Sequence, residues 1–562
     1  MLSSFKLRAT GAATRQEWHG LSSNAPSPIC AIALLAFVSF STPRAVIATA
    51  APAQQEVTRD FQKTLPLNAG QSFRIENKFG EVRVHGESSR EVKISATIRV
   101  QSRSREEAEA SSQKIQIDVL QTGESVLVRT VFPDEGKWLN LGKGTSYSVN
   151  YDIALPADAP LFVRNSFGSV IASGVRARSD IENNHGSLTV RDSGPARLNN
   201  SFGSVDLIGA SGDASINDNN GSVQASEIKG ALEIRNRFGS ITVRNVQGAA
   251  NITGGNGAIV VSDTGTASIT NSFGGVEVRN VHGDLTVHDN NGNVDITTVS
   301  GGATVSNSFG NVTFADVKGR LDCTTSNGRV KGSSVGGGPV NIRDSFGAIE
   351  LENIAGPLDA ETSNGKITVR DARGAVILKT SFGAIEALGI PKGIRATTGN
   401  GAINLTDIGA DTYAKTSFGA IIAERINGNF IAEDSNGSVT ARQVKGDAQV
   451  TTSFSGVSLE SIGGRITVDN QNGAIDVSAM RPASGCRDIA LKTSFSSIRV
   501  HIPEGLGYNV LARTSFGRIN SDLPVTANGS INSDTLNSTI GSDGYKLQLT
   551  NSNGSIEITK GS

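Results

Sequence analysis

The chain has 562 residues, of which 64 are glycine, 37% are hydrophobic and 5% are aromatic, and its 52 Lys and Arg nearly balance its 53 Asp and Glu. Glycine without a strict three-residue period excludes collagen, and the lack of long apolar segments excludes a polytopic membrane protein. A net charge of −1 gives no basic surface for phosphates, so we expect no nucleic-acid partner.

Residues 1–50 have the pattern of a secretion signal. Lys6, Arg8 and Arg15 precede the apolar run Ile29–Phe40, and small residues around Ala50 offer a cleavage site. This run is too short to span a bilayer, which favours a signal peptide over an anchor. We therefore expect an exported protein, in the periplasm, on the cell surface or outside the cell, with no integral membrane segment after cleavage.

Two cysteines, Cys323 and Cys486, remain beyond the signal. Their wide separation in a repetitive chain places them many repeats apart, beyond the reach of a disulfide. We expect two unpaired thiols that behave as small apolar residues.

A Phe-Gly pair recurs every 35 to 37 residues, and an Asn-Gly pair falls midway between most of them. The first such midway position is His185-Gly186, and the last phenylalanine of the series is followed by serine. The phenylalanines of this stack are Phe167, Phe202, Phe238, Phe273, Phe309, Phe346, Phe382, Phe418 and Phe454. The structural unit is therefore about 18 residues, half of the sequence repeat.

Eighteen residues are too few for a strand and a crossover helix, and apolar residues alternate with polar ones between the glycines, as in Leu232 and Ile234. The sequence predicts an all-β protein, a parallel β-solenoid of about 18 coils over residues 161–478, with glycine at a positive φ in each corner. An apolar residue every six positions is missing, so we expect a right-handed or flattened coil rather than a left-handed hexapeptide helix.

The residue two positions before each corner pair shares the phase of the apolar residues. In seventeen of eighteen coils it can form hydrogen bonds, the exception being Gly254. Stacked coils would align these side chains in a structural ladder with a spacing of about 4.8 Å. The ladder residues are Asn165, Asn183, Asn200, Asp218, Asn236, Asn271, Asp289, Asn307, Thr325, Asp344, Thr362, Thr380, Thr398, Thr416, Asp434, Thr452 and Asn470.

The stack phenylalanines fall in the same period-two phase, so we expect them in the core, filling a corner in every second coil. The alternative is an exposed aromatic ridge that stacks on sugars.

Both ends of the array depart from the repeat and are expected to be caps, which protect the terminal coils from pairing with other chains. Residues 51–160 form a β-rich cap with one diverged coil and a short helix near Arg105, opened by the capping box of Ser104 and Glu107. Residues 479–562 contain diverged coils and the C-terminal cap.

The sequence predicts no catalytic, cofactor-binding or metal-binding residues. Coil length varies by one residue, so no long loops exist to wall a catalytic cleft. The aspartates of the ladder are expected to form hydrogen bonds at corners, and Asp218-Asn-Asn-Gly221 is expected to be an Asx turn rather than a calcium site.

The corners NSFGSV and NNGSVQ, the opening FRIENKFGEVRVHG and the closing NSNGSIEITKG resemble a bacterial family of exported β-strand-repeat proteins labelled putative adhesin. The resemblance covers residues 57–560. It implies a right-handed β-solenoid at the cell envelope, of unknown function and without catalytic residues to transfer.

These observations favour a non-enzymatic, exported, adhesin-like or envelope-associated solenoid that binds a surface glycan or an envelope protein, or acts as a spacer. Two alternatives stay open. One is a scaffold that assembles end to end through its terminal coils. The other is a polysaccharide lyase or hydrolase whose site lies between the N-terminal cap and the first coils. That cap is the only aromatic-rich region, with Lys137, Trp138, Tyr147 and Tyr151.

Overall fold

The computed structural model describes residues 55–133, 144–478, 487–542 and 544–561. The expected signal at residues 1–50, Lys137, Trp138 and Cys486 lie outside the described residues.

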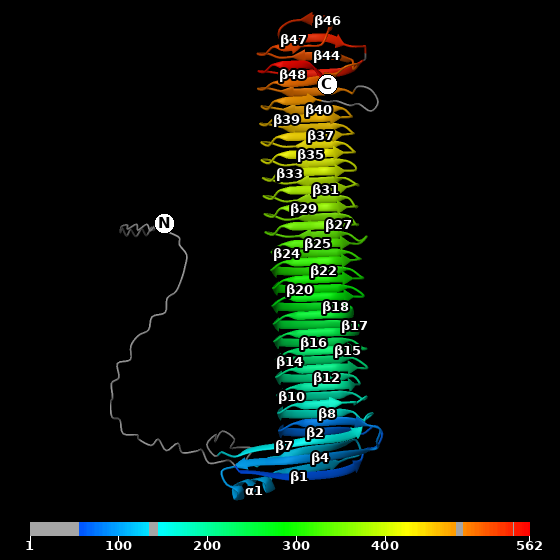
Figure 1. Ribbon diagram of the computed structural model, residues 1–562, viewed down its shortest axis with the longest axis vertical. Coiled ribbons are helices and arrows are strands. Elements are labelled where there is room, and N and C mark those ends of the chain that lie inside the picture. The colour runs from blue at the N-terminus through cyan, green and yellow to red at the C-terminus, as the bar shows by residue number, and fades with distance from the viewer. Residues whose placement is uncertain (1–54, 134–143, 479–486, 543, 562) are drawn as a thin grey trace, which may run out of the picture. The chain divides into compact units, whose positions relative to one another are not determined.

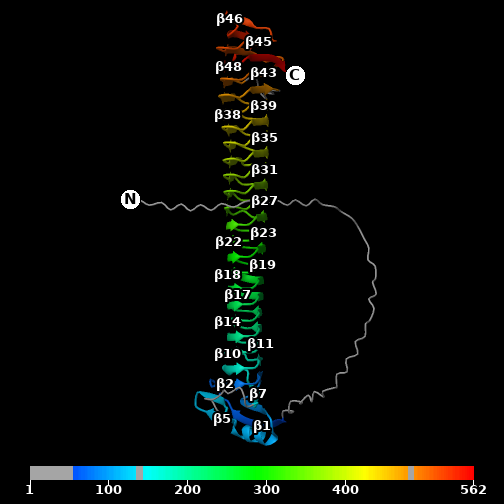
Figure 2. The ribbon, with the colours of Figure 1, turned by 90° about the vertical axis from the view of Figure 1, so that its left-hand side faces the viewer.

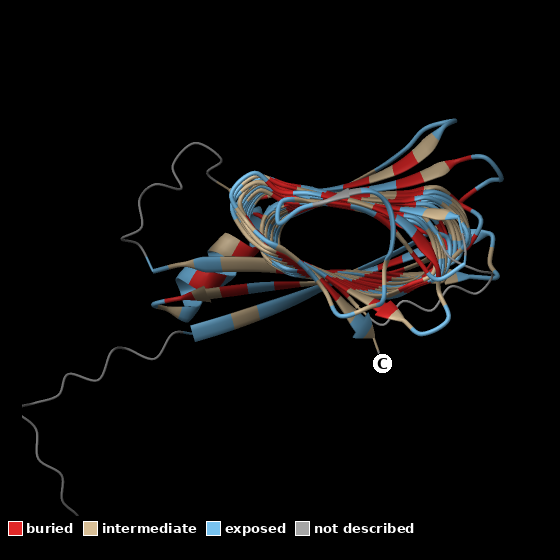
Figure 3. Ribbon diagram, turned by 90° about the horizontal axis from the view of Figure 1, so that it is seen from above, coloured by how far each residue is buried: buried red, intermediate tan, exposed pale blue. Residues whose placement is uncertain are grey.

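The described chain is a parallel β-solenoid of about 18 coils, with about 18 residues to a coil (Figure 1). Each coil contributes one strand to each of two facing walls, which Figure 2 shows edge-on. Seen along the stack, the coils superpose as a flattened oval with buried residues along both walls (Figure 3). The predicted fold class is confirmed.

Wall one consists of β8 (Leu161–Phe167), β10 (Ser179–His185), β12 (Ala196–Phe202), β14 (Ala214–Asn220), β16 (Leu232–Phe238), β20 (Leu285–Asn291), β22 (Ala303–Phe309), β24 (Leu321–Asn327), β26 (Val340–Arg343), β28 (Leu358–Glu361), β30 (Val376–Lys379), β32 (Ile394–Thr397), β34 (Thr412–Lys415), β36 (Phe430–Glu433), β38 (Ala448–Thr452), β40 (Ile466–Asn470) and β42 (Ile489–Thr493). Wall two consists of β9 (Val170–Ser173), β11 (Leu188–Ser193), β13 (Val205–Ala210), β15 (Val223–Ile228), β19 (Val276–Val281), β21 (Val294–Val299), β23 (Val312–Val317), β25 (Val330–Val335), β27 (Ile349–Ile354), β29 (Ile367–Ala372), β31 (Ile385–Ile390), β33 (Ile403–Ile408), β35 (Ile421–Ile426), β37 (Val439–Val444), β39 (Val457–Ile462), β41 (Ile475–Ser478) and β43 (Ile498–Pro503). Two long strands, β17 (Ile241–Asn256) and β18 (Ile259–Phe273), contribute to both walls.

The core is a set of columns in which each inward side chain lies on the equivalent side chain of the next coil. Leu198, Ile216 and Ile234 form one such column, in register and buried. Burying an aliphatic side chain of this size contributes about 1.5–3 kcal/mol, so every coil is stabilised mainly by its two neighbours.

One column contains a large residue, Phe314, and compensates for it in the next coil. Phe314 is buried and pairs in register with Gly332. A Cβ atom on Gly332 would lie 2.0 Å from ring atoms of Phe314. The glycine makes the space that the ring fills.

We expect Gly332→Ala to destabilise the surrounding coils by about 1–3 kcal/mol, because the ring has no free volume to move into. Adding Phe314→Leu should restore most of the loss. A double-mutant cycle, measured by hydrogen exchange of the flanking strands, checks this coupling. Additive effects of the two changes would contradict it.

The second corner, at the end of wall two, is built without glycine in most coils. In the described residues, fourteen non-glycine residues there adopt φ between +50° and +60°. They recur at intervals of about 18 residues, except where Gly209 and Gly389 take the same place. Asp and Asn are frequent among them, since their short polar side chains tolerate this conformation. The members are Asp192, Glu227, Asn245, Asp263, Asn280, Thr298, Asp316, Ser334, Asn353, Asp371, Asp407, Arg425, Gln443 and Ser461.

The N-terminal cap comprises β1 (Gln55–Pro66), β2 (Ser72–Phe79), β3 (Val82–Glu87), β4 (Glu91–Ser102), α1 (Arg105–Lys114), β5 (Gln116–Gln121), β6 (Ser125–Val131) and β7 (Ser146–Pro156). Strands β2 and β3 form a coil that pairs in parallel with β8 and β9. The long strands β1 and β4 pair antiparallel beyond it, and α1 contacts both of them. The amide of Glu107 donates to Ser104 Oγ at 3.2 Å, which caps the helix.

The C-terminal cap comprises β44 (Tyr508–Arg513), β45 (Ile519–Ser521), β46 (Thr526–Ile531), β47 (Thr535–Ile540), β48 (Tyr545–Asn551) and β49 (Ile556–Gly561). The last two strands return into the stack: β48 lies between β42 and β44, and β49 lies between β43 and β45. Spatial order and chain order therefore differ here. The antiparallel strands β46 and β47 cover this end (Figure 1).

Candidate functional site

The first corner, at the end of wall one, is built around the ladder. All seventeen ladder residues are buried. Asn236 Nδ2 donates to the carbonyl of Gly239 in its own corner at 3.2 Å and to that of Gly221 in the preceding corner at 2.8 Å. Each asparagine of this kind ties two successive corners together and satisfies carbonyl groups that the turn would leave unpaired.

In later coils, threonine hydroxyl groups form the hydrogen bonds that join successive corners. Thr398 Oγ1 accepts from the amide of Gly401 at 3.2 Å and donates to the carbonyl of Gly383 at 2.9 Å. The strands of wall one are shorter in this region, and the corner glycines after Gly310 have no φ between +20° and +160° in the regular array. The expectation of a positive φ in every corner therefore holds only in some of the earlier coils, for example at Gly203 and Gly239 but not at Gly221 or Gly292.

The core assignment of the stack phenylalanines is wrong. Phe167, Phe202, Phe238, Phe273, Phe309, Phe346, Phe382, Phe418 and Phe454 are all exposed, from 37% at Phe167 to 65% at Phe418. Alternation stops at the ladder residue, because its side chain fills the inside of the corner and the backbone bends around it. The phenylalanine two positions later consequently points to solvent.

These phenylalanines, and the residue at the same place in each coil between them, form one continuous column, which we call the ridge. Register pairs and corner hydrogen bonds connect its members coil by coil. In spatial order the ridge is Phe79, Phe167, His185, Phe202, Asn220, Phe238, Asn256, Phe273, Asn291, Phe309, Asn327, Phe346, Asn364, Phe382, Asn400, Phe418, Asn436, Phe454, Asn472, Phe495, Asn553 and Phe516.

Both ends of the ridge contain members that the regular spacing missed. The amide of Asn553 donates to the carbonyl of Ser494, and the amide of Phe516 donates to that of Ser552. Asn553 therefore lies between Phe495 and Phe516, which keeps the alternation of Phe and Asn although the chain order is different. The tetrapeptide Asn-x-Phe-Gly at Asn77, and Thr-x-Phe at Thr493 and Thr514, is the sequence signal for these coils.

At its N-terminal end the ridge is a stack of rings. The centroids of Phe79 and Phe167 are 5.4 Å apart, those of Phe167 and His185 are 4.6 Å apart, and those of His185 and Phe202 are 4.8 Å apart. Interplanar angles of 13–18° show that these rings face along the stack. From Phe202 onward asparagine replaces the intervening ring, and the phenylalanines become more exposed.

The ridge lies in a strip with little charge. We consider four residues at each corner, starting one before the ridge Phe or Asn, as in Ser201–Ser204. From Ser201 to Ser497 these segments contain three charged residues: Arg237, Arg329 and Lys366. Most of their other residues are serine, glycine, asparagine and alanine. A line of exposed aromatic rings set among small polar groups is typical of an interaction surface.

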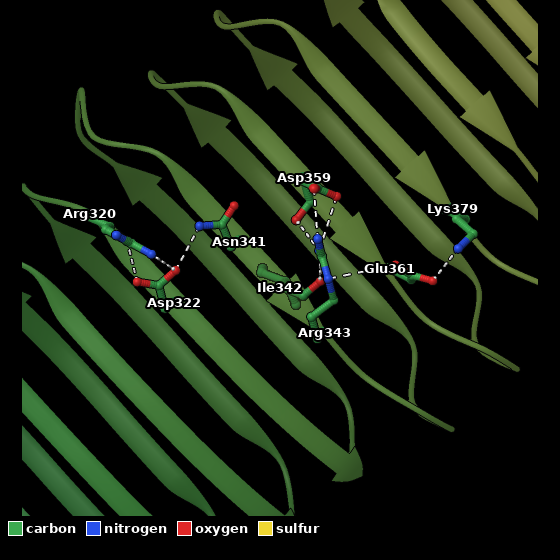
Figure 4. A network of polar contacts seen from close by, with 8 residues as sticks. All are labelled: Arg320, Asp322, Asn341, Ile342, Arg343, Asp359, Glu361 and Lys379. Carbon is green, nitrogen blue, oxygen red and sulfur yellow. Dashed lines mark hydrogen bonds and ion pairs between the residues drawn. The ribbon is translucent and has the colours of Figure 1, made fainter.

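The outer faces of the walls differ from the ridge, because their charges pair across neighbouring coils. Arg343 binds both carboxylate oxygens of Asp359, at 3.1 and 2.7 Å, and Glu361 accepts from Lys379 Nζ at 2.7 Å (Figure 4). These exposed pairs contribute little to stability but give the wall a polar, ion-paired surface.

Burial raises the pKa of two ladder aspartates, Asp218 and Asp289, from 3.8 to about 6, and raises that of Asp344 and Asp434. Neither carboxylate oxygen of Asp218 or Asp289 has a hydrogen-bond partner of good geometry. These carboxyl groups lie inside the corner, away from solvent. Their protonation state therefore affects the stability of the turn.

Of the residues named for a catalytic site in the N-terminal cap, the two that the structure describes, Tyr147 and Tyr151, pack against the core of the cap. Tyr151 is buried, its hydroxyl lies 2.6 Å from Thr130 Oγ1, and burial raises its pKa to about 12. The rings of Phe132 and Tyr147 are 6.5 Å apart.

In the part of the chain that the structure describes, no group of three or more His, Cys, Asp and Glu side chains is arranged to hold a metal. No described helix has both the length and the apolar character to cross a membrane. Cys323 is buried and unpaired, and burial raises the pKa of its thiol to about 12.

No protein-family profile and no curated protein matches this chain. Two solved structures show a weak similarity. A putative cell adhesion protein from Clostridium sporogenes is 10% identical, with a TM-score of 0.21 over 42% of this chain and all of that chain. A putative adhesin from Parabacteroides merdae is 12% identical, with a TM-score of 0.11 over 62% of this chain and 95% of that chain. At such scores neither carries an argument about this chain.

Proposed function

We propose that this chain is an exported, non-enzymatic, adhesin-like rod that makes its contacts through the ridge. The supporting observation is the ridge itself, an exposed line of phenylalanines in a nearly uncharged strip that runs the length of the solenoid. Monomeric soluble proteins rarely expose so many large apolar side chains along one line. The basic residues and apolar run of the first 50 residues support export.

The ridge suits a partner that is engaged at many points. Each ridge phenylalanine offers an apolar contact, and the neighbouring serines and asparagines offer hydrogen bonds, so weak contacts repeated coil after coil would add up. A surface glycan and an envelope protein are the two partner classes that such a surface fits. The covered ends of the stack disfavour assembly through terminal coils.

The test is a pull-down of polysaccharides, peptidoglycan and envelope extracts with purified residues 54–562. Phe346→Ser, Phe382→Ser and Phe418→Ser together remove part of the ridge. Ile377→Ser, Ile422→Ser and Ile431→Ser serve as the control, since they remove exposed apolar side chains from the outer walls. We expect the ridge variant to lose at least about tenfold in affinity while the control binds normally.

Binding that survives in the ridge variant would contradict the proposal, because the contacts would then lie on the walls or the caps. Circular dichroism of all three proteins establishes that they remain folded. We expect it to be unchanged, since the substituted side chains are exposed.

A further inference from the structure

We propose that the occupant of the ridge is the ridge of a second copy of this chain. Two rods would lie antiparallel, with the phenylalanine rings of each seated in the asparagine notches of the other. This inference deepens the proposed function by choosing, among the envelope proteins proposed there, a second copy of this chain. It rests on that proposal in one respect, that the ridge is the contact surface.

The notches are a property of the ridge asparagines. Asn436 Nδ2 donates to the carbonyl of Ser417 in the preceding coil at 3.2 Å, and Asn472 Nδ2 donates to that of Ser453 at 3.1 Å. Asn553 does the same to Ser494, also at 3.1 Å. These side chains are held back against the preceding coil, so the longer phenylalanines on either side project past them. In these coils the ridge therefore projects at its phenylalanines, one in every second coil, with a notch at each asparagine between them.

The spacing of the ridge phenylalanines accepts one aromatic ring per notch. Coils are about 4.8 Å apart, so successive phenylalanines are about 9.6 Å apart and a ring midway is about 4.8 Å from both. That is a stacking distance. The chain already contains this arrangement, since His185 lies between Phe167 and Phe202 at 4.6 and 4.8 Å, with interplanar angles of 13°. In the other notches the ring is absent and a partner can supply it.

The direction of the rings favours a second copy over a sugar chain. The stacked rings at Phe167 and Phe202 turn their faces along the rod and their edges outward. A polysaccharide lying along the ridge would meet ring edges, whereas stacking on sugars uses ring faces. A partner ring that enters a notch meets two faces.

Charge and area also allow the pairing. With three charged residues in its corners between Ser201 and Ser497, one ridge can approach another with little repulsion. Each ridge phenylalanine exposes on the order of 100 Å², and roughly ten of them would bury about 1,000 Å² per rod. A standard interface buries about 800 Å² per partner.

Symmetry sets the direction of the two rods. A two-fold axis along the rods would place phenylalanine opposite phenylalanine at the same height. A two-fold axis perpendicular to the rods, midway between the coils of Asn364 and Phe382, places every phenylalanine from Phe238 to Phe516 opposite an asparagine. A closed pair with interdigitated rings is therefore antiparallel.

The experiment measures the mass of residues 54–562 by sedimentation over a range of concentrations, at about pH 8, where an imidazole is neutral. We expect a dimer. The triple serine variant at Phe346, Phe382 and Phe418 should raise the dimer dissociation constant at least about tenfold. The decisive variant fills the notches by Asn364→His, Asn400→His and Asn436→His, which repeats the arrangement at His185. It should also dissociate the dimer, although it adds apolar surface, and the isoleucine variant should not.

Several results would overturn the pairing. One is a wild-type rod that stays monomeric at its highest soluble concentration, and another is a dimer that resists both ridge variants. A notch-filled variant that associates as tightly as wild type would show that partner rings do not enter the notches. A monomer that still captures a glycan or envelope protein through the ridge refutes the pairing and leaves the proposed function intact. A dimer that captures neither refutes only the proposed ligand classes.

Discussion

Gly383→Ala is expected to open the coils around it and to lower their stability by about 3 kcal/mol or more. A Cβ atom on Gly383 would lie 1.8 Å from the carbonyl oxygen of Gly365 and 2.4 Å from its carbonyl carbon. Both are backbone atoms of the preceding coil, held by the parallel ladder, so neither can swing aside. The coils would have to separate, which breaks the bond from Thr380 Oγ1 to the carbonyl of Gly365.

Hydrogen exchange of the strands that flank Gly383 is the suitable measurement, because a long repeat array unfolds in parts rather than as one unit. Gly337→Ala is the matched control, since a Cβ atom there would have no neighbour within 4 Å. We expect fast exchange confined to the coils around residue 383 in the first variant and none in the second. Equal protection in both would refute the argument from close contact.

The close approach of the glycines explains both a success and an error of the sequence-based prediction. The recurrence of glycine at intervals of 18 residues correctly indicated a corner in every coil. Its cause was only partly identified, because beyond Gly310 the corner glycine is needed for contact with the coil below rather than for a positive φ. Sequence alone does not distinguish a close contact with the neighbouring coil from a positive φ, since both favour glycine over a residue with a side chain.

The burial of the ladder followed from period-two alternation, and the exposure of the ridge did not. Alternation holds only while the strand is straight, and Asn236 marks the point at which it bends. Counting two residues further, to Phe238, carried the rule past that bend into the last residues of β16, where alternation no longer holds. The second corner gave no signal, because residues as different as Asp192, Thr298 and Arg425 occupy the same left-handed conformation. The sequence did not predict the return of β48 and β49 into the stack, because these strands pair with β42 and β43, which are not adjacent to them in the chain.

Asp218→Asn and Asp289→Asn are expected to stabilise the solenoid at neutral pH by about 2 kcal/mol each. Asparagine at the equivalent place, as in Asn236, donates to two carbonyl groups of the corner. An ionised carboxylate has no proton to donate to such carbonyl groups, while a protonated one can donate. Burial favours the protonated form and raises the pKa of both groups to about 6, although hydrogen bonds from the next two backbone amides lower it in part.

The pH dependence follows from the direction of that shift. Between about pH 4 and pH 6 the folded state retains protons on Asp218 and Asp289 that the unfolded state has released. Stability from these two groups is therefore greatest below about pH 4 and is lost as the pH rises through about 6. The asparagine variants should show no gain at the acid end of this window and their full gain above it.

Thermal unfolding and hydrogen exchange of the double variant and the wild type, followed across this window, measure the difference directly. Asp295→Asn removes the same charge from an exposed position on the outer face of β21 and is the control for general charge effects. A difference between double variant and wild type that is constant with pH, or that matches the control, would mean that both carboxylates are ionised in the folded corner. The ladder would then accept charge as readily as amide groups, and the alternation of Asn, Thr and Asp along it would have no energetic consequence.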